Sequence, residues 1–136
     1  MQSGKRKWAK ILLICLLAAV MLVGLRPKVR AQLFVARWGS AIEESLAAGN
    51  GVPAGVEMSY GNGDRIEFSL GGWGLGSQTS YYGCYYSYED VPQALQMDAQ
   101  ALIKTGEGTW QWQAEGDNHG MTEKLREHWY YYEMYF

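Results

Sequence analysis

An uncharged stretch of fifteen residues, ILLICLLAAVMLVGL, runs from Ile11 to Leu25 and determines how the rest of the chain is arranged. Seven basic residues flank it: Lys5, Arg6, Lys7, Lys10, Arg26, Lys28 and Arg30. A helix that spans a bilayer needs about 17–25 apolar residues, whereas the apolar region of a signal peptide has about 7–15. Because the stretch lies at this boundary, its length alone leaves a retained anchor and a cleaved signal both open.

The residues around the stretch favour a retained anchor. Trp8 suits the membrane interface, and Lys10 can extend its ammonium group into the headgroup region. The only small-residue cleavage candidate, at residues 29–31, lies in a cationic segment that follows Pro27, which is a poor context for signal peptidase. We therefore predict a basic N-terminus and a transmembrane anchor over residues 1–27, with the quoted stretch as its apolar core.

The charge of the chain is divided between two parts. Residues 1–30 carry seven Lys or Arg and no acid, whereas residues 31–136 carry five Lys or Arg and fourteen Asp or Glu. An acidic domain repels nucleic-acid phosphates, so we expect no nucleic-acid partner. The basic N-terminus is interpreted as a topology signal that contacts lipid headgroups. Since the basic flanks are nearly balanced, only the default orientation of an N-terminal signal anchor places the domain outside the cytoplasm.

A second helix is predicted within residues 28–50. Apolar residues recur there at every fourth position: Phe34, Trp38, Ile42 and Leu46. This spacing forms a stripe along one helix face, and Gly49 can take the left-handed conformation that ends the helix. We expect the stripe to pack on the domain's own sheet. The alternatives are a partner helix or the membrane surface.

After residue 56 the hydrophobic period changes from four to two, which indicates strands. Two alternating runs, 56–60 and 66–70, flank Asn62-Gly63, a strong signal for a hairpin with a type I′ turn. Further strands are predicted at residues 77–88, 99–103 and 110–113 and over the last eight or nine residues. Residues 122–127 are compatible with either a strand or a short helix.

Two local features are expected between these strands. The glycine-rich residues 71–76 predict a bend or a bulge. Residues 93–95 can form a short helical turn with Asp90 as its N-cap.

The predicted fold class is α+β: an N-terminal transmembrane helix, then an amphipathic helix packed on an antiparallel sheet of five to six strands. Residues 51–136 form the β-rich part, which packs with residues 28–50 as one unit. A cystatin-like arrangement of one helix on a sheet matches this order of elements. The analogy concerns the fold alone and implies no function.

The sequence predicts no cofactor and no metal site. Residues 71–76 have neither the G-x-G-x-x-G pattern nor the Lys-Ser/Thr that a phosphate-binding loop requires. The only cluster with metal-ligating chemistry consists of His119, Glu123, Glu127 and His128. It has no H-E-x-x-H pattern, and its charges, beside Lys124 and Arg126, are typical of a solvated face.

Enzyme activity is not predicted either. Cys84 is the single thiol after residue 31, and it lacks basic sequence neighbours that would activate it. Cys15 follows Ile14 rather than a small residue, which excludes a lipidation signal. No pair of carboxylates is singled out for glycoside hydrolysis.

The aromatic content is the feature furthest from average. Five tyrosines lie between Tyr81 and Tyr88, and four more between Tyr130 and Tyr135. Exposed Trp and Tyr rings on a sheet stack on sugar rings or anchor a protein partner, whereas a domain poor in aliphatic residues uses such rings as core. Since both faces of the first cluster carry tyrosine, some rings should be exposed. The candidate contact residues are Trp73, Tyr82, Tyr86, Trp110, Trp112, Tyr130 and Tyr132.

Two segments carry a resemblance to a known group of proteins. They are YYGCYYSYEDVPQAL, residues 81–95, and DNHGMTEKLREHWYYYEMYF, residues 117–136. They resemble small membrane-anchored proteins of anaerobic Gram-positive bacteria, in which a YYG-x-YYS segment and a terminal E-x-W-Y-Y-Y-E-M strand bracket a short middle. The resemblance implies an anchor followed by a domain and a membrane location. The group has no assigned activity, so no functional residue is carried over.

These observations together predict a single-pass membrane protein with a non-catalytic extracytoplasmic module that binds an unknown protein or polysaccharide partner. Two alternatives remain open. One is a carbohydrate-binding or cell-wall-acting domain, possibly hydrolytic, that uses exposed Trp and Tyr rings. The other is a small subunit of a membrane complex.

Overall fold

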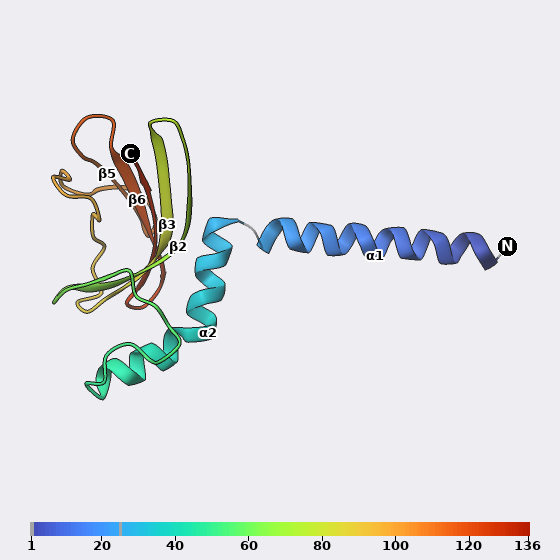
Figure 1. Ribbon diagram of the computed structural model, residues 1–136, viewed down its shortest axis with the longest axis horizontal. Coiled ribbons are helices and arrows are strands. Elements are labelled where there is room, and N and C mark those ends of the chain that lie inside the picture. The colour runs from blue at the N-terminus through green and yellow to red at the C-terminus, as the bar shows by residue number, and fades with distance from the viewer. Residues whose placement is uncertain (1, 25) are drawn as a thin grey trace.

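The computed structural model describes residues 2–24 and 26–136, with the side chains of residues 6–24 and 26–136. Helix α1 (Gln2–Gly24) extends away from the rest of the molecule, and α2 (Pro27–Ala47) lies against one face of a curved sheet (Figure 1). The strands are β1 (Tyr60–Gly61), β2 (Arg65–Leu75), β3 (Gln78–Ser87), β4 (Ile103–Gly106), β5 (Thr109–Gln113), β6 (His119–Arg126) and β7 (Trp129–Tyr135). The α+β class is confirmed, but the sheet has seven strands instead of five to six.

All neighbouring strands are antiparallel, in the order β1-β2-β3-β7-β6-β5-β4. Two meanders, β1 to β3 and β4 to β7, join where β7 pairs with β3. In that pairing Cys84 lies opposite Tyr131, and Tyr86 lies opposite Trp129. The two aromatic-rich segments of the sequence are therefore neighbours at the centre of the sheet.

Strand β6 settles the segment that the sequence left open between strand and helix. It pairs with β7 along its length and with β5 over residues 119–123. Met121 and Leu125 pack against the core on the α2 side, whereas Thr122 is buried on the other face. Pairing on both edges satisfies the backbone groups of β6, which outweighs its weak helical periodicity.

The hairpin at Asn62-Gly63 is present, but its form differs from the prediction. Strand β1 has only two residues, and neither Asn62 nor Gly63 has a positive φ, so the turn is not type I′. The Asn62 carboxamide oxygen accepts the N–H groups of Asp64 (2.8 Å) and Arg65 (2.9 Å). The Asn62 side chain thus supplies the acceptor that closes the turn.

The glycine-rich segment forms the end of strand β2 rather than a bend. The expected bulge is present between Ser69 and Gly71, and the chain then continues as strand to Leu75. The turn to β3 consists of Gly76 and Ser77, with Gly76 at φ +66°. A Cβ atom on Gly71 would lie 2.5 Å from the Tyr82 hydroxyl, so glycine allows that phenol to cross β2.

Two elements of secondary structure that the sequence predicts are not formed at the predicted residues. Residues 93–95 are not helical, and residues 99–102 are not in a strand. Asp90 has φ +54°, and its carboxylate accepts Lys124 Nζ (2.7 Å) and the His128 N–H (2.8 Å). Because Asp90 is held by the β6–β7 turn, its side chain is not available to cap a helix.

The end of helix α2 is formed as predicted: Gly49, two residues after Ala47, takes the left-handed conformation with φ +75°. The Gly49 N–H donates to Leu46 O (3.0 Å), and the Asn50 N–H donates to Ser45 O (2.9 Å). This pair of bonds is a Schellman motif, which satisfies carbonyls that the end of a helix would otherwise leave free.

The apolar stripe of α2 packs on the chain's own sheet, as predicted, with Ile42 buried and Phe34, Trp38 and Leu46 half-buried. Ala31 and Val35, which are outside the predicted stripe, are buried beside it. This core also contains Ile66, Phe68, Cys84, Trp129 and Tyr131 from the sheet.

A second cluster lies on the opposite face of the sheet. Tyr85, Tyr130 and Tyr132 are fully buried there and pack with Leu95, Trp110 and Met134. The segment between β3 and β4 covers them, since the Gln93 N–H donates to the Tyr85 hydroxyl (2.9 Å) and the Gln96 side chain donates to Tyr135 O (2.9 Å). Both faces of the centre of the sheet are therefore covered.

Glu43 joins α2 to the sheet. Its Oε1 accepts the Trp129 indole N–H and the Arg126 guanidinium, each at 2.7 Å. A Cβ atom on Gly39 would lie 2.3 Å from Arg126 Nη2, so glycine lets the guanidinium cross the helix. Figure 1 shows α2 changing direction near its middle, around this part of the helix.

The variant Glu43→Ala should destabilise the domain by about 1–3 kcal/mol, because it leaves the buried Trp129 N–H without its acceptor. Chemical unfolding of the full chain in detergent micelles, followed by near-UV circular dichroism, measures this loss. The matched control is Glu44→Ala, which alters the adjacent exposed carboxylate and should change stability by less than about 0.5 kcal/mol. Equal unfolding midpoints for the two variants would contradict the role of Glu43.

Candidate functional site

One row of side chains across the sheet forms a cleft beyond the N-terminal end of α2. The register places Trp73 of β2 opposite Ser80 of β3, Ser80 opposite Tyr135 of β7, and Tyr135 opposite His119 of β6. Residues directly opposite each other on antiparallel strands project to the same face. The four side chains therefore lie in one row on the face that α2 also covers.

Helix α2 stops short of this row. The first turns of α2 contact the rows that follow this one toward the centre of the sheet. There Arg30 Nη1 donates to the Tyr82 hydroxyl (2.5 Å), and Lys28 pairs with Glu123 (2.5 Å). The row that contains Ser80 and Tyr135 is left open to solvent.

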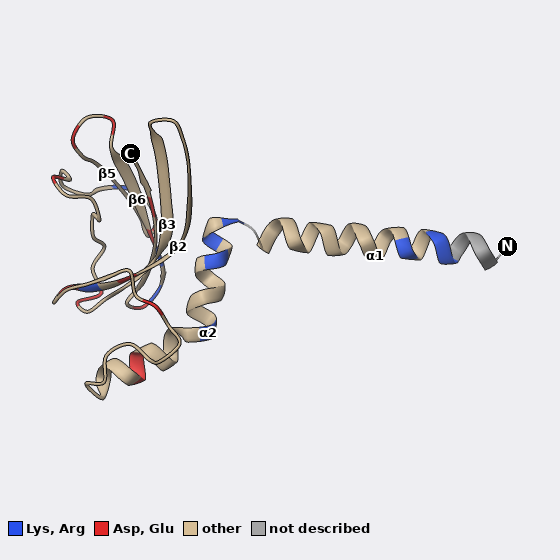
Figure 2. Ribbon diagram, viewed as in Figure 1, with Lys and Arg blue, Asp and Glu red and all other residues tan. Residues whose placement is uncertain are grey.

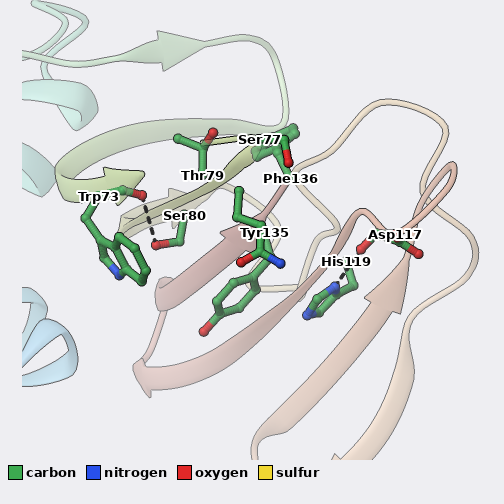
Figure 3. Close-up of a pocket in the computed structure, with 9 residues that line it drawn as sticks. Trp73, Ser77, Thr79, Ser80, Asp117, His119, Tyr135 and Phe136 are labelled. Atoms are coloured by element: carbon green, nitrogen blue, oxygen red, sulfur yellow. Dashed lines mark hydrogen bonds between the residues drawn. The ribbon is translucent and has the colours of Figure 1, made fainter. Parts of the chain in front are cut away.

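The small side chain of Ser80 leaves room between two aromatic rings. Neighbouring strands lie about 4.8 Å apart, so Trp73 and Tyr135 rise from strands separated by about 10 Å. The resulting cleft has a volume of about 450 Å³. It is lined by Trp73, Ser77, Gln78, Thr79, Ser80, Asp117, His119, Tyr135 and Phe136 (Figure 3).

Two of the aromatic rings in the cleft are held against each other, and the third is exposed. Figure 3 shows Trp73, Tyr135 and His119 following one another along the cleft. The His119 ring stacks on Tyr135 with centroids 4.8 Å apart and planes at 12°, and its Nδ1 lies 2.8 Å from Asp117 O. Trp73 is 68 % exposed. A ligand would therefore meet a stacked Tyr135–His119 pair and an accessible Trp73 ring.

The carboxylate of Glu133, two residues before Tyr135 on β7, holds the Tyr135 ring through a hydrogen bond. Tyr135 and Tyr131 each donate a hydroxyl hydrogen bond to one of its two oxygens. The hydrogen bond to Glu133, together with burial, raises the pKa of Tyr135 to about 12. Tyr135 is thus protonated at physiological pH, and because its hydroxyl hydrogen is donated to Glu133, it offers the cleft an aromatic ring rather than a hydrogen-bond donor.

The remaining lining groups are mostly uncharged. Ser77, Thr79 and Ser80 offer hydroxyls, and Gln78 offers a carboxamide. Asp117 is the one carboxylate among the described residues that line the cleft. The lining thus offers a ligand mainly neutral hydrogen-bonding groups beside aromatic rings.

Of the seven contact residues predicted from the sequence, only Trp73 lies in the cleft. Trp112, Tyr130 and Tyr132 are at most 2 % exposed and form core. The segment after β3 causes this burial, since Gln96 Oε1 accepts the Trp112 indole N–H (2.7 Å) and Leu95 packs against the two tyrosines. These three predictions are therefore corrected.

The other three predicted residues are half-buried and do not meet in one place. Tyr82 lies beneath the start of α2, and Tyr86 stacks on His128 with centroids 5.3 Å apart. Trp110 lies on the opposite face of the sheet, with its ring 6.3 Å from Tyr130.

The sequence did not single out Ser80, His119, Tyr135 and Phe136 as a binding surface. The cluster of possible metal ligands that includes His119 and His128 is not formed, because His119 begins β6 whereas His128 lies in the turn after it. Within residues 2–24 and 26–136, no group of three or more His, Cys, Asp or Glu side chains is placed to hold a metal ion. The cleft depends on the pairing of β3 with β7, which no local pattern reveals.

The Cys84 thiol is likewise not placed for chemistry. It is fully buried beneath α2, and burial raises its pKa. A thiol held in its neutral form in an apolar core is a poor nucleophile. Cys84 acts in this structure as a small core residue.

Comparisons of the chain with protein-family models, with curated proteins and with solved structures find no match. The resemblance to small membrane-anchored proteins of anaerobic Gram-positive bacteria therefore stays a prediction.

The variant Glu133→Gln should return the pKa of Tyr135 from about 12 toward its ordinary value of about 10. A ¹³Cζ-tyrosine NMR titration of the full chain in micelles measures this change. Because the folded pKa is raised, the contribution of Tyr135 to stability is complete below about pH 10 and is lost as the pH rises through 12. The variant should lose less stability in that window. The control Glu57→Gln, in an exposed loop, should leave the titration unchanged, and an unchanged titration in Glu133→Gln would refute the assignment.

Proposed function

We propose that this chain is a single-pass membrane protein whose extracytoplasmic domain binds a neutral glycan in the aromatic cleft and does not convert it chemically. The observation that carries the proposal is the uncovered row formed by Trp73, Ser80, Tyr135 and His119. It is the place where the rings lie accessible in one row with hydroxyl and amide groups beside them.

The shape and chemistry of the cleft favour a sugar ring. Aromatic faces carry partial negative charge, so they attract the C–H-rich faces of sugars. The gap above Ser80 accepts a flat ring between Trp73 and Tyr135, and the hydroxyls of Ser77 and Thr79 can pair with sugar hydroxyls. The volume of the cleft falls in the usual range for small-ligand sites, about 300–1,000 Å³.

The charge of the domain favours a neutral ligand. Residues 31–136 carry fourteen acidic and only five Lys or Arg residues. A polyanionic ligand would be repelled by this surface, whereas a neutral glycan would not.

The membrane tether in this proposal rests on α1. Residues 6–24 of this helix are long and apolar enough to cross a bilayer, and none of them is buried within the molecule. A cleaved signal sequence has the same character. We propose a retained anchor because the junction after Gly24 contains Pro27 and basic residues instead of a cleavage site.

Calorimetric titration of the full chain in nanodiscs with neutral N-acetylglucosamine oligomers and neutral hexose oligomers tests the glycan site. Trp73→Ala and Tyr135→Ala should each weaken binding by about tenfold or more, because each removes a stacking face. Ser80→Tyr should abolish binding by filling the gap. The matched control is Leu75→Ala, which alters another highly exposed residue of the same strand outside the cleft and should bind normally. Absence of binding to every neutral oligomer would refute the glycan proposal.

Extraction of membranes with alkaline carbonate tests the tether. The full chain should stay in the membrane fraction, and its intact mass should include residues 1–30. Leu17→Arg should release the chain or reduce its insertion, because an arginine at the centre of a span costs about 2.5–3.5 kcal/mol, whereas Leu17→Ala should behave like the natural sequence. A soluble chain that begins near residue 31 would show instead that the segment is a cleaved signal.

A further inference from the structure

We propose that the outward face of α2 lies on the anionic surface of the bilayer and holds the domain there in one orientation. This face, which we call the basic stripe, consists of Arg26, immediately before the helix, and of Arg30, Leu33 and Arg37 within it. The inference rests on the proposed membrane tether and is independent of the glycan site.

Helix geometry places the four residues of the basic stripe together. At 3.6 residues per turn, positions 26, 30, 33 and 37 fall within an arc of about 60°. The buried residues Ala31, Val35 and Ile42 lie on the opposite side of the helix. All four stripe residues are exposed, and Leu33 is 60 % exposed although it is apolar.

The charge of α2 is distributed unevenly along its length. Residues 26–42 contain no acidic residue. Of the two acids that follow, Glu43 is turned to the sheet, where it pairs with Arg126, and Glu44 lies about two helical turns beyond Arg37. Figure 2 shows basic residues at the end of α2 nearest α1 and an acidic residue near its far end.

The arginines of the stripe keep their charge available. Among the described residues, the carboxylate-paired cation at this end of α2 is Lys28, which contacts Glu123 at 2.5 Å. Arg30 donates one hydrogen bond to the Tyr82 hydroxyl and lies 5.8 Å from the centroid of the Tyr82 ring, and the Arg37 guanidinium lies 5.1 Å from the centroid of the Trp38 ring. None of these contacts neutralises an arginine, and guanidinium groups have further donors for lipid phosphates.

The position of α2 in the chain keeps the stripe near the headgroups. Helix α1 ends at Gly24 and α2 begins at Pro27, so the intervening residues span at most about 10 Å. Attraction to an anionic surface extends over about one Debye length, which is about 10 Å at 0.1 M salt. In Figure 1 the chain turns sharply after α1, and the first part of α2 runs across the direction of α1. A bilayer crossed by α1 would therefore run alongside the basic stripe, and Leu33 would contact its interface as apolar residues of interfacial helices do.

A fluorescent reporter on the stripe tests the proposal in the full chain. Leu33→Cys is labelled with an environment-sensitive dye on a Cys15→Ala background, and buried Cys84 stays unlabelled. The chain is reconstituted in phosphatidylcholine vesicles with and without phosphatidylglycerol, and both contain a headgroup-level lipid quencher. We expect strong quenching with phosphatidylglycerol at low salt, and weaker quenching in pure phosphatidylcholine or in 1 M salt.

Charge variants measure the contribution of the arginines. Arg37→Gln should lower the ratio of docked to undocked domain about fivefold, and Arg26→Gln with Arg37→Gln about thirtyfold. The matched control is Lys104→Gln, which removes one exposed positive charge from β4 and should leave the ratio unchanged. A dye at Lys104→Cys should remain unquenched in both kinds of vesicle.

Three outcomes would overturn the proposal. A dye at residue 33 that is unquenched in phosphatidylglycerol vesicles shows that the stripe does not dock, although flotation of the chain with the vesicles would leave the tether intact. Quenching that is equal in both lipids and in 1 M salt shows that charge does not hold the domain. A chain that fails to float with any vesicle removes both the tether and the docking.

Discussion

The pairing of β3 with β7 is the constraint on which the rest of this structure depends. It joins the two meanders and brings the Tyr81–Tyr86 and Trp129–Met134 segments into register at the centre of the sheet. Alternation along these two strands sends Cys84, Trp129 and Tyr131 toward α2, and Tyr85, Tyr130 and Tyr132 toward the opposite face. A slip of one residue would exchange the two faces, because side chains alternate with a period of two. The same register sets Ser80 opposite Tyr135, so the core and the cleft have one structural cause.

Most of the Tyr and Trp residues of the sheet are core residues, because both faces of the sheet are covered. A sheet covered only by α2 would leave Tyr85, Tyr130 and Tyr132 in water, but the segment between β3 and β4 closes over them. The Tyr85 hydroxyl is paired with the Gln93 N–H of that segment and with Thr122 of β6. Buried tyrosines are tolerated only where their hydroxyls find partners, and no buried side-chain polar atom among the described residues lacks one. What remains exposed as a row is the end of the sheet that neither α2 nor this segment reaches.

The sequence predicted those parts of the fold that depend on short-range patterns. The four-residue period gave α2, Gly49 marked its end, and the aromatic runs gave β3 and β7. It failed at Asn62-Gly63 because the Asn62 side chain closes the turn by accepting hydrogen bonds from the backbone that directly follows it. It failed at Asp90 because distant partners, Lys124 and His128, hold the side chain that was expected to cap a helix. Alternation along β7 separates Tyr130 and Tyr132 from Tyr135, but it does not reveal that the segment between β3 and β4 covers the face of the first two while α2 leaves the row of Tyr135 open.

The cleft and the basic stripe constrain each other through the position of α2. Both lie on the same side of the sheet, because α2 packs on the face from which Ser80 and Tyr135 project. If the outward face of α2 contacts the headgroups, the sheet stands one helix diameter, about 10 Å, from the bilayer surface, with the cleft on the membrane side. A glycan in the cleft would then be bound beside the membrane rather than far from it. The acidic surface elsewhere on the domain supports this orientation, since an anionic bilayer repels it and attracts only the segment of α2 that carries arginine without acid.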